Sequence, residues 1–352
     1  MSSESPTSLN DYYYGSDLYS QVPAANSPIS LAIPVSNLSR DNGSDLLLIN
    51  ITSDPVTNAF SSQISALSGI NGNKLWQKDY PDSLAFATAA GDLNGDHHTD
   101  IMVNVVIAGT SFIPYSSVTA LDGRNGEEIW NDPHFLAATL AYPIKDITGD
   151  NATEFLVHVF GIDSLNGTVA TKIAEVDGAS GTELGSQIFS GAVAVEYPAG
   201  NFSSDTVQDS VTAIYRINQT EQNATTEIEA IDGQDRAMLW NKTFTSLALA
   251  LPIKDLTGDG RDELMVYLMS FANNNTSSEM AVLQGSDGEL LWKNSFGGVL
   301  AFAMAGPDLS GDGRADLIVY KLGNSSDSEV VAVKGDDGSI LWTRKGTIIL
   351  PQ

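Results

Sequence analysis

The sequence predicts an all-β protein, a β-propeller of six four-stranded antiparallel blades, from three observations. A phrase ending in tryptophan recurs about every 50 to 55 residues, and an aspartate-rich loop recurs with nearly the same period. Each of these units contains four short strand patterns, and no segment keeps the 3.6-residue apolar period of a helix. Self-similarity at this spacing is typical of repeat architectures, and four short strands per unit are typical of a propeller blade.

The first marker is the tryptophan phrase. It reads SGINGNKLW, DGRNGEEIW, DGQDRAMLW, SDGELLW and DDGSILW, and it ends at Trp76, Trp130, Trp240, Trp292 and Trp342. In the third unit, DGASGTELG places Gly185 at the tryptophan position. We expect the tryptophans on the outer strand of each blade, packed between neighbouring blades in a structural role.

The second marker is the polar residue that begins each loop. It recurs about every 54 residues, at Asn37, Asp92, Asp146, Asn201, Asp255 and Asp308. Two independent markers therefore share one period.

The second unit illustrates the strand pattern. Residues 84–90 are small and apolar, as suits an innermost strand crowded at the axis, and residues 100–107 form a nearly continuous apolar strand. Residues 117–123 alternate between apolar and polar and end in an Asp-Gly turn, and residues 126–130 form a short fourth strand.

The period places one propeller domain over residues 28–352, after an N-terminal segment of residues 1–27. The predicted blades span residues 28–80, 81–134, 135–189, 190–244, 245–297 and 298–352. Residues 15–21 resemble a fourth strand and residues 347–352 the start of a first strand. They either supply closing strands or indicate a seven-bladed or longer array from which the chain is cut. Six blades are the favoured prediction.

Composition excludes several functional classes. The chain has 44 acidic and 17 basic residues, a net charge of −27, which disfavours nucleic acid and anionic membrane surfaces as partners. The absence of cysteine excludes disulfides, thiolate zinc sites and cysteine nucleophiles. No apolar run approaches the roughly 20 residues of a transmembrane helix. The first ten residues lack the features of a signal peptide, so we expect either a mature N-terminus near this point or an intracellular protein.

The nine-residue loops between the first and second strands carry oxygen-bearing side chains at positions 1, 3, 5 and 9. Calcium takes six to eight oxygen ligands, and a loop that turns around the ion supplies them at alternate positions. Glycine at position 4 allows the bend, position 7 can offer its carbonyl, and a carboxylate at position 9 can bind through both oxygens. The candidate ligands in four loops are Asp92, Asn94, Asp96 and Asp100; Asp146, Thr148, Asp150 and Glu154; Asp255, Thr257, Asp259 and Glu263; and Asp308, Ser310, Asp312 and Asp316.

Two further loops are weaker candidates because asparagine replaces the leading aspartate. Their ligand positions are Asn37, Ser39, Asp41 and Asp45, and Asn201, Ser203, Asp205 and Asp209. We therefore expect about four to six Ca²⁺ ions. The alternative for any single loop is an Asp-Gly turn favoured for backbone reasons alone. Agreement among four loops favours calcium, and it favours calcium over magnesium, which retains more water.

The phrase D-x-[NTS]-G-D-G-x-x-[DE] before an aliphatic strand resembles the FG-GAP calcium repeats of integrin alpha-chain propellers and of microbial surface proteins. The tryptophan phrase is similar to the blade motif of quinoprotein dehydrogenases. Both resemblances cover nearly the whole chain at the level of the repeat. The FG-GAP letters themselves are degenerate here, as in AFATAAGDL and AFAMAGPDL.

Asn-X-Ser/Thr sequons are frequent, which favours an exported glycoprotein located outside the cell or at its surface. Four antiparallel strands place the acidic loops and the Asp-Gly turns on one face and the second-to-third-strand loops on the other. The sequons expected on that second face are Asn50, Asn166, Asn218, Asn223, Asn274, Asn275 and Asn324.

The FG-GAP resemblance implies a non-enzymatic, calcium-stabilised extracellular scaffold for adhesion or protein–protein contact, with a protein or glycan partner. The alternative is a carbohydrate-binding or polysaccharide-active propeller, for which the candidate aromatic side chains are Tyr12, Tyr13, Tyr14, Phe112 and Tyr115. A quinone-dependent dehydrogenase is the least favoured function, because the chain is short and lacks the vicinal cysteines of many such enzymes.

No catalytic constellation is evident in the sequence. His97 and His98 occupy non-ligand positions of one acidic loop, His134 and His158 are isolated, and no serine lies in a G-x-S-x-G elbow. The chain is therefore expected not to be an enzyme and to have no catalytic residues.

Overall fold

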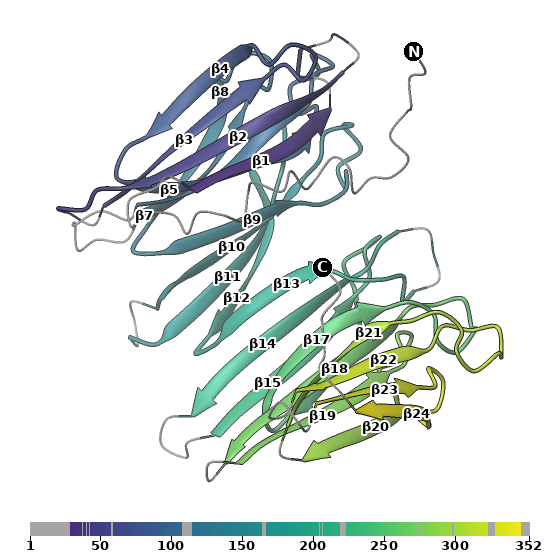
Figure 1. Cartoon of the computed structure of the whole chain (residues 1–352). Coiled ribbons are helices and arrows are strands. Elements are labelled where there is room, and N and C mark those ends of the chain that lie inside the picture. The colour runs from purple at the N-terminus through teal and green to yellow at the C-terminus, as the bar shows by residue number, and fades with distance from the viewer. Residues whose placement is uncertain are drawn as a thin grey trace, which may run out of the picture. The chain divides into compact units, whose positions relative to one another are not determined.

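The computed structural model confirms the predicted fold class. It describes residues 29–36, 38–39, 41, 43–57, 59–107, 115–163, 167–203, 205, 207–218, 223–272, 275–297, 299–322 and 328–345. In these residues the regular elements are strands, with no helix, and the strands form six four-stranded antiparallel sheets (Figure 1). The predicted closing strands at residues 15–21 and 347–352 lie outside the described residues.

Each sheet follows chain order. The first two sheets contain β1 (Ile29–Ser36), β2 (Ser44–Ser53), β3 (Phe60–Leu67) and β4 (Lys74–Tyr80), then β5 (Ser83–Gly91), β6 (Asp100–Ile107), β7 (Tyr115–Leu121) and β8 (Glu128–Phe135). The next two contain β9 (Ala138–Pro143), β10 (Phe155–Ile162), β11 (Val169–Val176) and β12 (Glu183–Ser190), then β13 (Val193–Pro198), β14 (Ser210–Asn218), β15 (Asn223–Ile231) and β16 (Met238–Phe244). The last two contain β17 (Leu247–Ile253), β18 (Glu263–Ala272), β19 (Asn275–Leu283) and β20 (Leu290–Gly297), then β21 (Leu300–Ala305), β22 (Leu317–Leu322), β23 (Glu329–Val333) and β24 (Ile340–Lys345).

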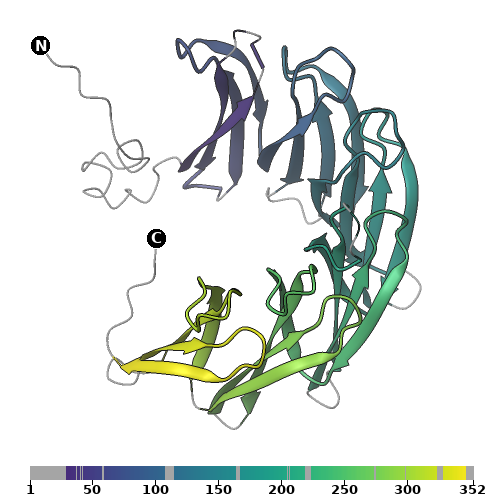
Figure 2. The same ribbon diagram turned by 90° about the vertical axis from the view of Figure 1, so that its right-hand side faces the viewer.

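The chain forms two compact units, which we describe separately. The first comprises the described residues up to Leu140 together with Asn151–Thr153 and Gly178–Gly181. The second comprises Ala141–Asp150, Glu154–Asp177 and the described residues from Thr182 onward. The antiparallel course of its last sheet, β21–β24, can be followed in yellow in Figure 2.

The second strands are continuously apolar because both of their faces are covered. In β18, Leu264 and Val266 pack in the cluster that contains Trp240 of the preceding sheet. The alternate residues Met265 and Tyr267 pack in the cluster that contains Leu317 of the following sheet. Successive strand residues point to opposite faces, so a strand between two sheets needs apolar side chains throughout.

The tryptophans join neighbouring sheets, as the sequence predicts. Each of the four that are followed by another blade is buried, and its indole Nε1 donates to the carbonyl of the turn glycine in the next sheet: Trp76 to Gly123, Trp130 to Gly178, Trp240 to Gly285 and Trp292 to Gly335, at 2.6 to 2.7 Å. We call this contact the tryptophan latch.

A second glycine of the same turn lies against the indole ring. At Gly288 an added Cβ would come within 2.7 Å of the Trp240 ring, and its φ of +71° is in the left-handed region. Any larger residue there would collide with the ring and strain the backbone.

Hydroxyl groups on the third strands form a further repeated link between sheets. Thr226 on β15 donates to the carbonyl of Ser246 and accepts from the amide of Ala248 at the start of the following sheet. Ser62, Thr171 and Ser278 make the same paired contacts in their sheets. These contacts explain why polar residues are buried within otherwise apolar strands.

The predicted sequons belong to the loops between second and third strands, at the strand ends opposite the acidic loops. Asn50 lies in β2, where its Oδ1 accepts a hydrogen bond from Ser30. Asn218, Asn223 and Asn275 lie at strand ends, whereas Asn166, Asn274 and Asn324 lie outside the described residues. Glycosylation stays a prediction. No helix in the described part of the chain is long and apolar enough to cross a membrane.

Candidate metal centres

The acidic loops wrap around the carboxylate at their first position. In the sixth loop, Asp308 Oδ1 accepts the amides of Gly311 and Asp312, and its Oδ2 accepts that of Gly313, at 2.6 to 3.1 Å. Asp255 and Asp92 bind their own loop amides in a similar way. These backbone bonds hold each loop in a tight turn around its first carboxylate.

Two loop positions have left-handed backbones. Glycine at position 4 has a φ of +77° to +83° in the four strong loops, as the bend predicts. Position 6 is also left-handed, and there Gly260 and Gly313 are matched by Asn151 and His97, with φ of 73° and 66°. Asparagine tolerates this conformation better than most residues do, and histidine is a further enriched residue type.

The carboxylate at position 9 has a structural role that sequence reasoning missed. It is almost completely buried in all six loops. Where it is aspartate, one oxygen accepts from loop amides and the other from the turn glycine between the third and fourth strands. In the sixth blade, Asp316 Oδ2 accepts from Leu309 and Ser310 at 2.6 Å, and Oδ1 accepts from Gly335 at 3.0 Å. This carboxylate therefore ties the acidic loop to the Asp-Gly turn.

This role predicts that Asp316→Asn destabilises the protein even when no metal is bound. An amide has only one acceptor oxygen, so buried N–H groups would lose their partner, at a cost of about 3 kcal/mol. The free energy of unfolding, measured by urea denaturation in chelator, checks this. Asp259→Asn, at an exposed loop position, is the control and should not lower that value by more than about 0.5 kcal/mol. Equal losses for the two variants would contradict the structural role.

Glutamate at position 9 changes the arrangement in the third and fifth loops. Its extra methylene carries the carboxylate further into the loop, where Glu263 Oε2 accepts from the Leu256 amide at 2.6 Å and Oε1 from the Thr257 hydroxyl at 3.0 Å. Glu154 likewise accepts from the amides of Ile147 and Thr148.

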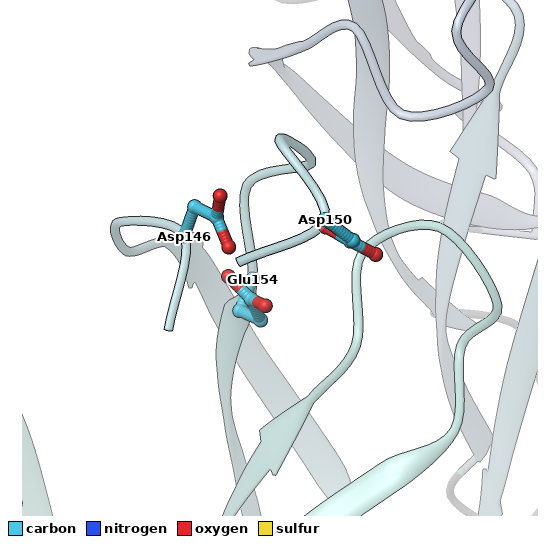
Figure 3. Close-up of side chains that lie close together, drawn as sticks. All are labelled: Asp146, Asp150 and Glu154. Atoms are coloured by element: carbon cyan, nitrogen blue, oxygen red, sulfur yellow. The ribbon is translucent and has the colours of Figure 1, made fainter. Parts of the chain in front are cut away.

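Two acidic triads result. Ligand atoms of Asp146, Asp150 and Glu154 lie within 4.8 Å of one another, as do those of Asp255, Asp259 and Glu263. Figure 3 shows the carboxylates of Asp146 and Glu154 pointing toward each other. Among the residues that the structure describes, these two loops alone bring three carboxylates so close together.

The electrostatics of the buried carboxylates favour a cation. Burial, reinforced by the charges of Asp255 and Asp259, raises the pKa of Glu263 to about 7. Burial also raises the pKa of Asp100 to about 6. A carboxylate held in this environment gains more from a nearby positive charge than one in water does.

In the second and sixth loops, basic side chains supply a positive charge near the loop carboxylates. The position-5 carboxylates Asp96 and Asp312 form ion pairs with Arg124 at 3.8 Å and Lys334 at 3.2 Å, respectively, from the adjoining Asp-Gly turns. In the fifth blade, the turn residue equivalent to Lys334 is Gln284, which donates to Asp259 at 3.2 Å. The third blade carries Asp177 and Ala179 at the two turn positions, so neither supplies a cation.

The first and fourth loops differ again. In the fourth loop, the Asn201 amide donates to the carbonyl of Asp205, a bond that a carboxylate cannot make. In the first loop, Asp41 accepts from the amide of Gly43 and the hydroxyl of Ser68, and Asn37 lies outside the described residues. In both loops the donors of these hydrogen bonds are uncharged groups of the protein.

The fold and the loops define the chain as a β-propeller with acidic triads that could hold metal ions. No protein-family model and no characterised protein matches its sequence. Solved structures with a similar fold include an apocarotenoid oxygenase variant from Synechocystis, with 13% identity over 87% of this chain and 71% of that chain and a TM-score of 0.37. An uncharacterized protein from Listeria monocytogenes has 10% identity over 90% and 82% of the two chains, with a TM-score of 0.36. A quinohemoprotein alcohol dehydrogenase from Comamonas testosteroni has 10% identity over 85% and 51%, with a TM-score of 0.28.

These neighbours correct one expectation. They include an oxygenase and a dehydrogenase, so the predictions that the chain is a non-enzymatic adhesion scaffold and that it is not an enzyme are withdrawn. The expectation of an adhesion scaffold rests on the FG-GAP resemblance alone. At these identities and TM-scores the likeness assigns no reaction or substrate to this chain.

Proposed function

We propose that this β-propeller binds Ca²⁺ through the acidic loops of its blades, in the manner of the FG-GAP repeats that it resembles. The observation that carries the proposal is the convergence of three carboxylates in each of the third and fifth loops. The donor set consists entirely of oxygens, with a hydroxyl at position 3, which fits a hard cation and excludes soft-metal chemistry.

The triads are proposed as the tighter sites. They hold three carboxyl groups each, and their turns carry no lysine or arginine at the positions of Lys334 and Arg124. In the second and sixth loops a metal would have to displace a basic side chain from the position-5 carboxylate. Of the four to six ions that the sequence predicts, two should therefore bind before the others.

A reciprocal exchange between the fifth and sixth turns tests this order. Lys334→Gln should add about one Ca²⁺ per chain at a fixed low calcium concentration, because it frees Asp312 from its ion pair. Gln284→Lys should remove about one, because the new cation would compete at Asp259. Isothermal titration calorimetry with Ca²⁺ measures both numbers. An unchanged number of bound Ca²⁺ ions in both variants would contradict competition between the basic side chain and Ca²⁺ for the position-5 carboxylate.

Loss of a ligand gives an independent test. Asp259→Ala should lower the number of Ca²⁺ ions by about one, and Asp205→Ala in the fourth loop is the matched control. Since Asp259 is exposed, the variant should fold, which circular dichroism checks. The proposal fails if metal analysis of the wild-type protein, equilibrated with calcium and desalted, finds no bound ion.

A further inference from the structure

One junction between sheets departs from the tryptophan latch. The outer strand of the third sheet has Gly185 where the other five sheets have a tryptophan. The turn of the following sheet has Arg236 where the four turns that receive a tryptophan have a left-handed glycine against the indole. The tryptophan of the latch and the glycine that packs against its ring are therefore both replaced at this junction, whereas the glycine at the acceptor position is kept as Gly233.

Arg236 bridges the two sheets here. Its guanidinium contacts Glu175 of β11 at 2.5 Å and Glu196 of β13 at 2.6 Å, and it donates to the Ser210 hydroxyl at 3.1 Å. Its backbone keeps the left-handed conformation of the replaced glycine, with a φ of 64°. Glu196 is buried, with 4% of its surface exposed. An ionic link thus replaces the aromatic one.

The exchange leaves a cavity of about 270 Å³, lined in part by Gly185, Leu156, Ile173, Glu175, Glu196 and Arg236. Leu156 and Ile173 are buried and form an apolar wall. Ser186 and Gln187, which also line the cavity, are exposed, so solvent reaches it from the outer strand. Pockets for drug-sized ligands measure roughly 300–1,000 Å³, so this volume suits a single small ring system.

The charges of the lining select the ligand. Two carboxylates and one guanidinium leave a net negative charge, which favours a cation. The apolar wall and the planar guanidinium favour a flat aromatic ring, which can stack on arginine. We propose that this cavity binds an arylalkylamine, with its ring in the place of the missing tryptophan side chain and its ammonium group sharing the carboxylates of Glu175 and Glu196 with the Arg236 guanidinium. None of the triad carboxylates lines the cavity, so this site is independent of calcium.

Three probes of one ring system test the charge preference: tryptamine, indole and indole-3-acetate. Calorimetric titration of the wild-type chain should give saturable binding of one tryptamine. Indole should bind about tenfold more weakly, and the anion more weakly still. Absence of saturable tryptamine binding, or equal affinity for the amine and the acid, would overturn the proposal.

Gly185→Trp would put an indole ring into the cavity that Gly185 lines, and it should therefore abolish tryptamine binding. Leu184→Trp is the matched control, since it adds the same side chain at the neighbouring, exposed position of β12 and should leave binding unchanged. Glu175→Gln supplies a test without a change of volume. It should weaken tryptamine about tenfold and leave indole unaffected. Tryptamine binding that persists in folded Gly185→Trp would show that the ligand lies elsewhere.

Discussion

Chelation of calcium with EGTA is expected to lower the midpoint of thermal unfolding by about 10 °C. A ligand that binds only the folded state at a hundredfold excess over its Kd contributes about 2.7 kcal/mol per site. Two triads therefore contribute about 5 kcal/mol, and a chain of this size loses roughly 2 °C per kcal/mol. Differential scanning fluorimetry with and without EGTA measures the shift.

The physical reason is the density of negative charge in each triad. Without an ion, Asp255, Asp259 and Glu263 repel one another while Glu263 is buried. The double variant Asp146→Asn with Asp255→Asn is the control, because the weakened triads should make its midpoint nearly independent of EGTA. An unchanged wild-type midpoint, with no metal found in the protein, would contradict the calcium assignment.

Truncation of a latch tryptophan is expected to be the most destabilising single substitution considered. Trp292→Ala should reduce the free energy of unfolding by about 3–5 kcal/mol, since it leaves a cavity between sheets and an unpaired carbonyl at Gly335. Trp342 occupies the same position of the last outer strand but is 41% exposed, compared with 7% for Trp292. Trp342→Ala should therefore cost less than about 1 kcal/mol.

Urea denaturation of the two alanine variants, with Trp292→Phe beside them, separates the contributions. Phenylalanine keeps most of the apolar surface but loses the indole N–H and part of the ring, so it should cost roughly 1–2 kcal/mol. Similar losses for Trp292→Ala and Trp342→Ala would show that the latch contributes little beyond the blade itself.

The interior of the fold follows closely from sequence patterns. The predicted second strand at residues 100–107 coincides with β6, and the first strand predicted at residues 84–90 lies within β5. The tryptophan phrase correctly predicts side chains packed between sheets. These predictions succeed because each blade repeats the same local contacts, so that one motif is supported by several copies in the chain.

The candidate sites follow less closely from sequence patterns than the interior does. The sequence pattern treats aspartate and glutamate at position 9 as equivalent and so predicts four similar loops. In the structure, the loops with aspartate differ from the loops with glutamate. Asp316 reaches a turn glycine, while Glu263 reaches into its own loop. The ion pairs of Arg124 and Lys334 come from turns about 20 to 30 residues away in the chain, and no loop motif reports them.

The sequence by itself determined the repeat, the number of sheets, the apolar second strands and the loops in which oxygen ligands are spaced for a cation. These features are local and periodic, and they depend on residue types at fixed spacing. Tertiary structure alone decided which loops bring their carboxylates together and how Arg236 bridges the junction at Gly185. Such contacts join separate loops and strands, so their geometry depends on side-chain reach and charge across neighbouring segments rather than on any single motif.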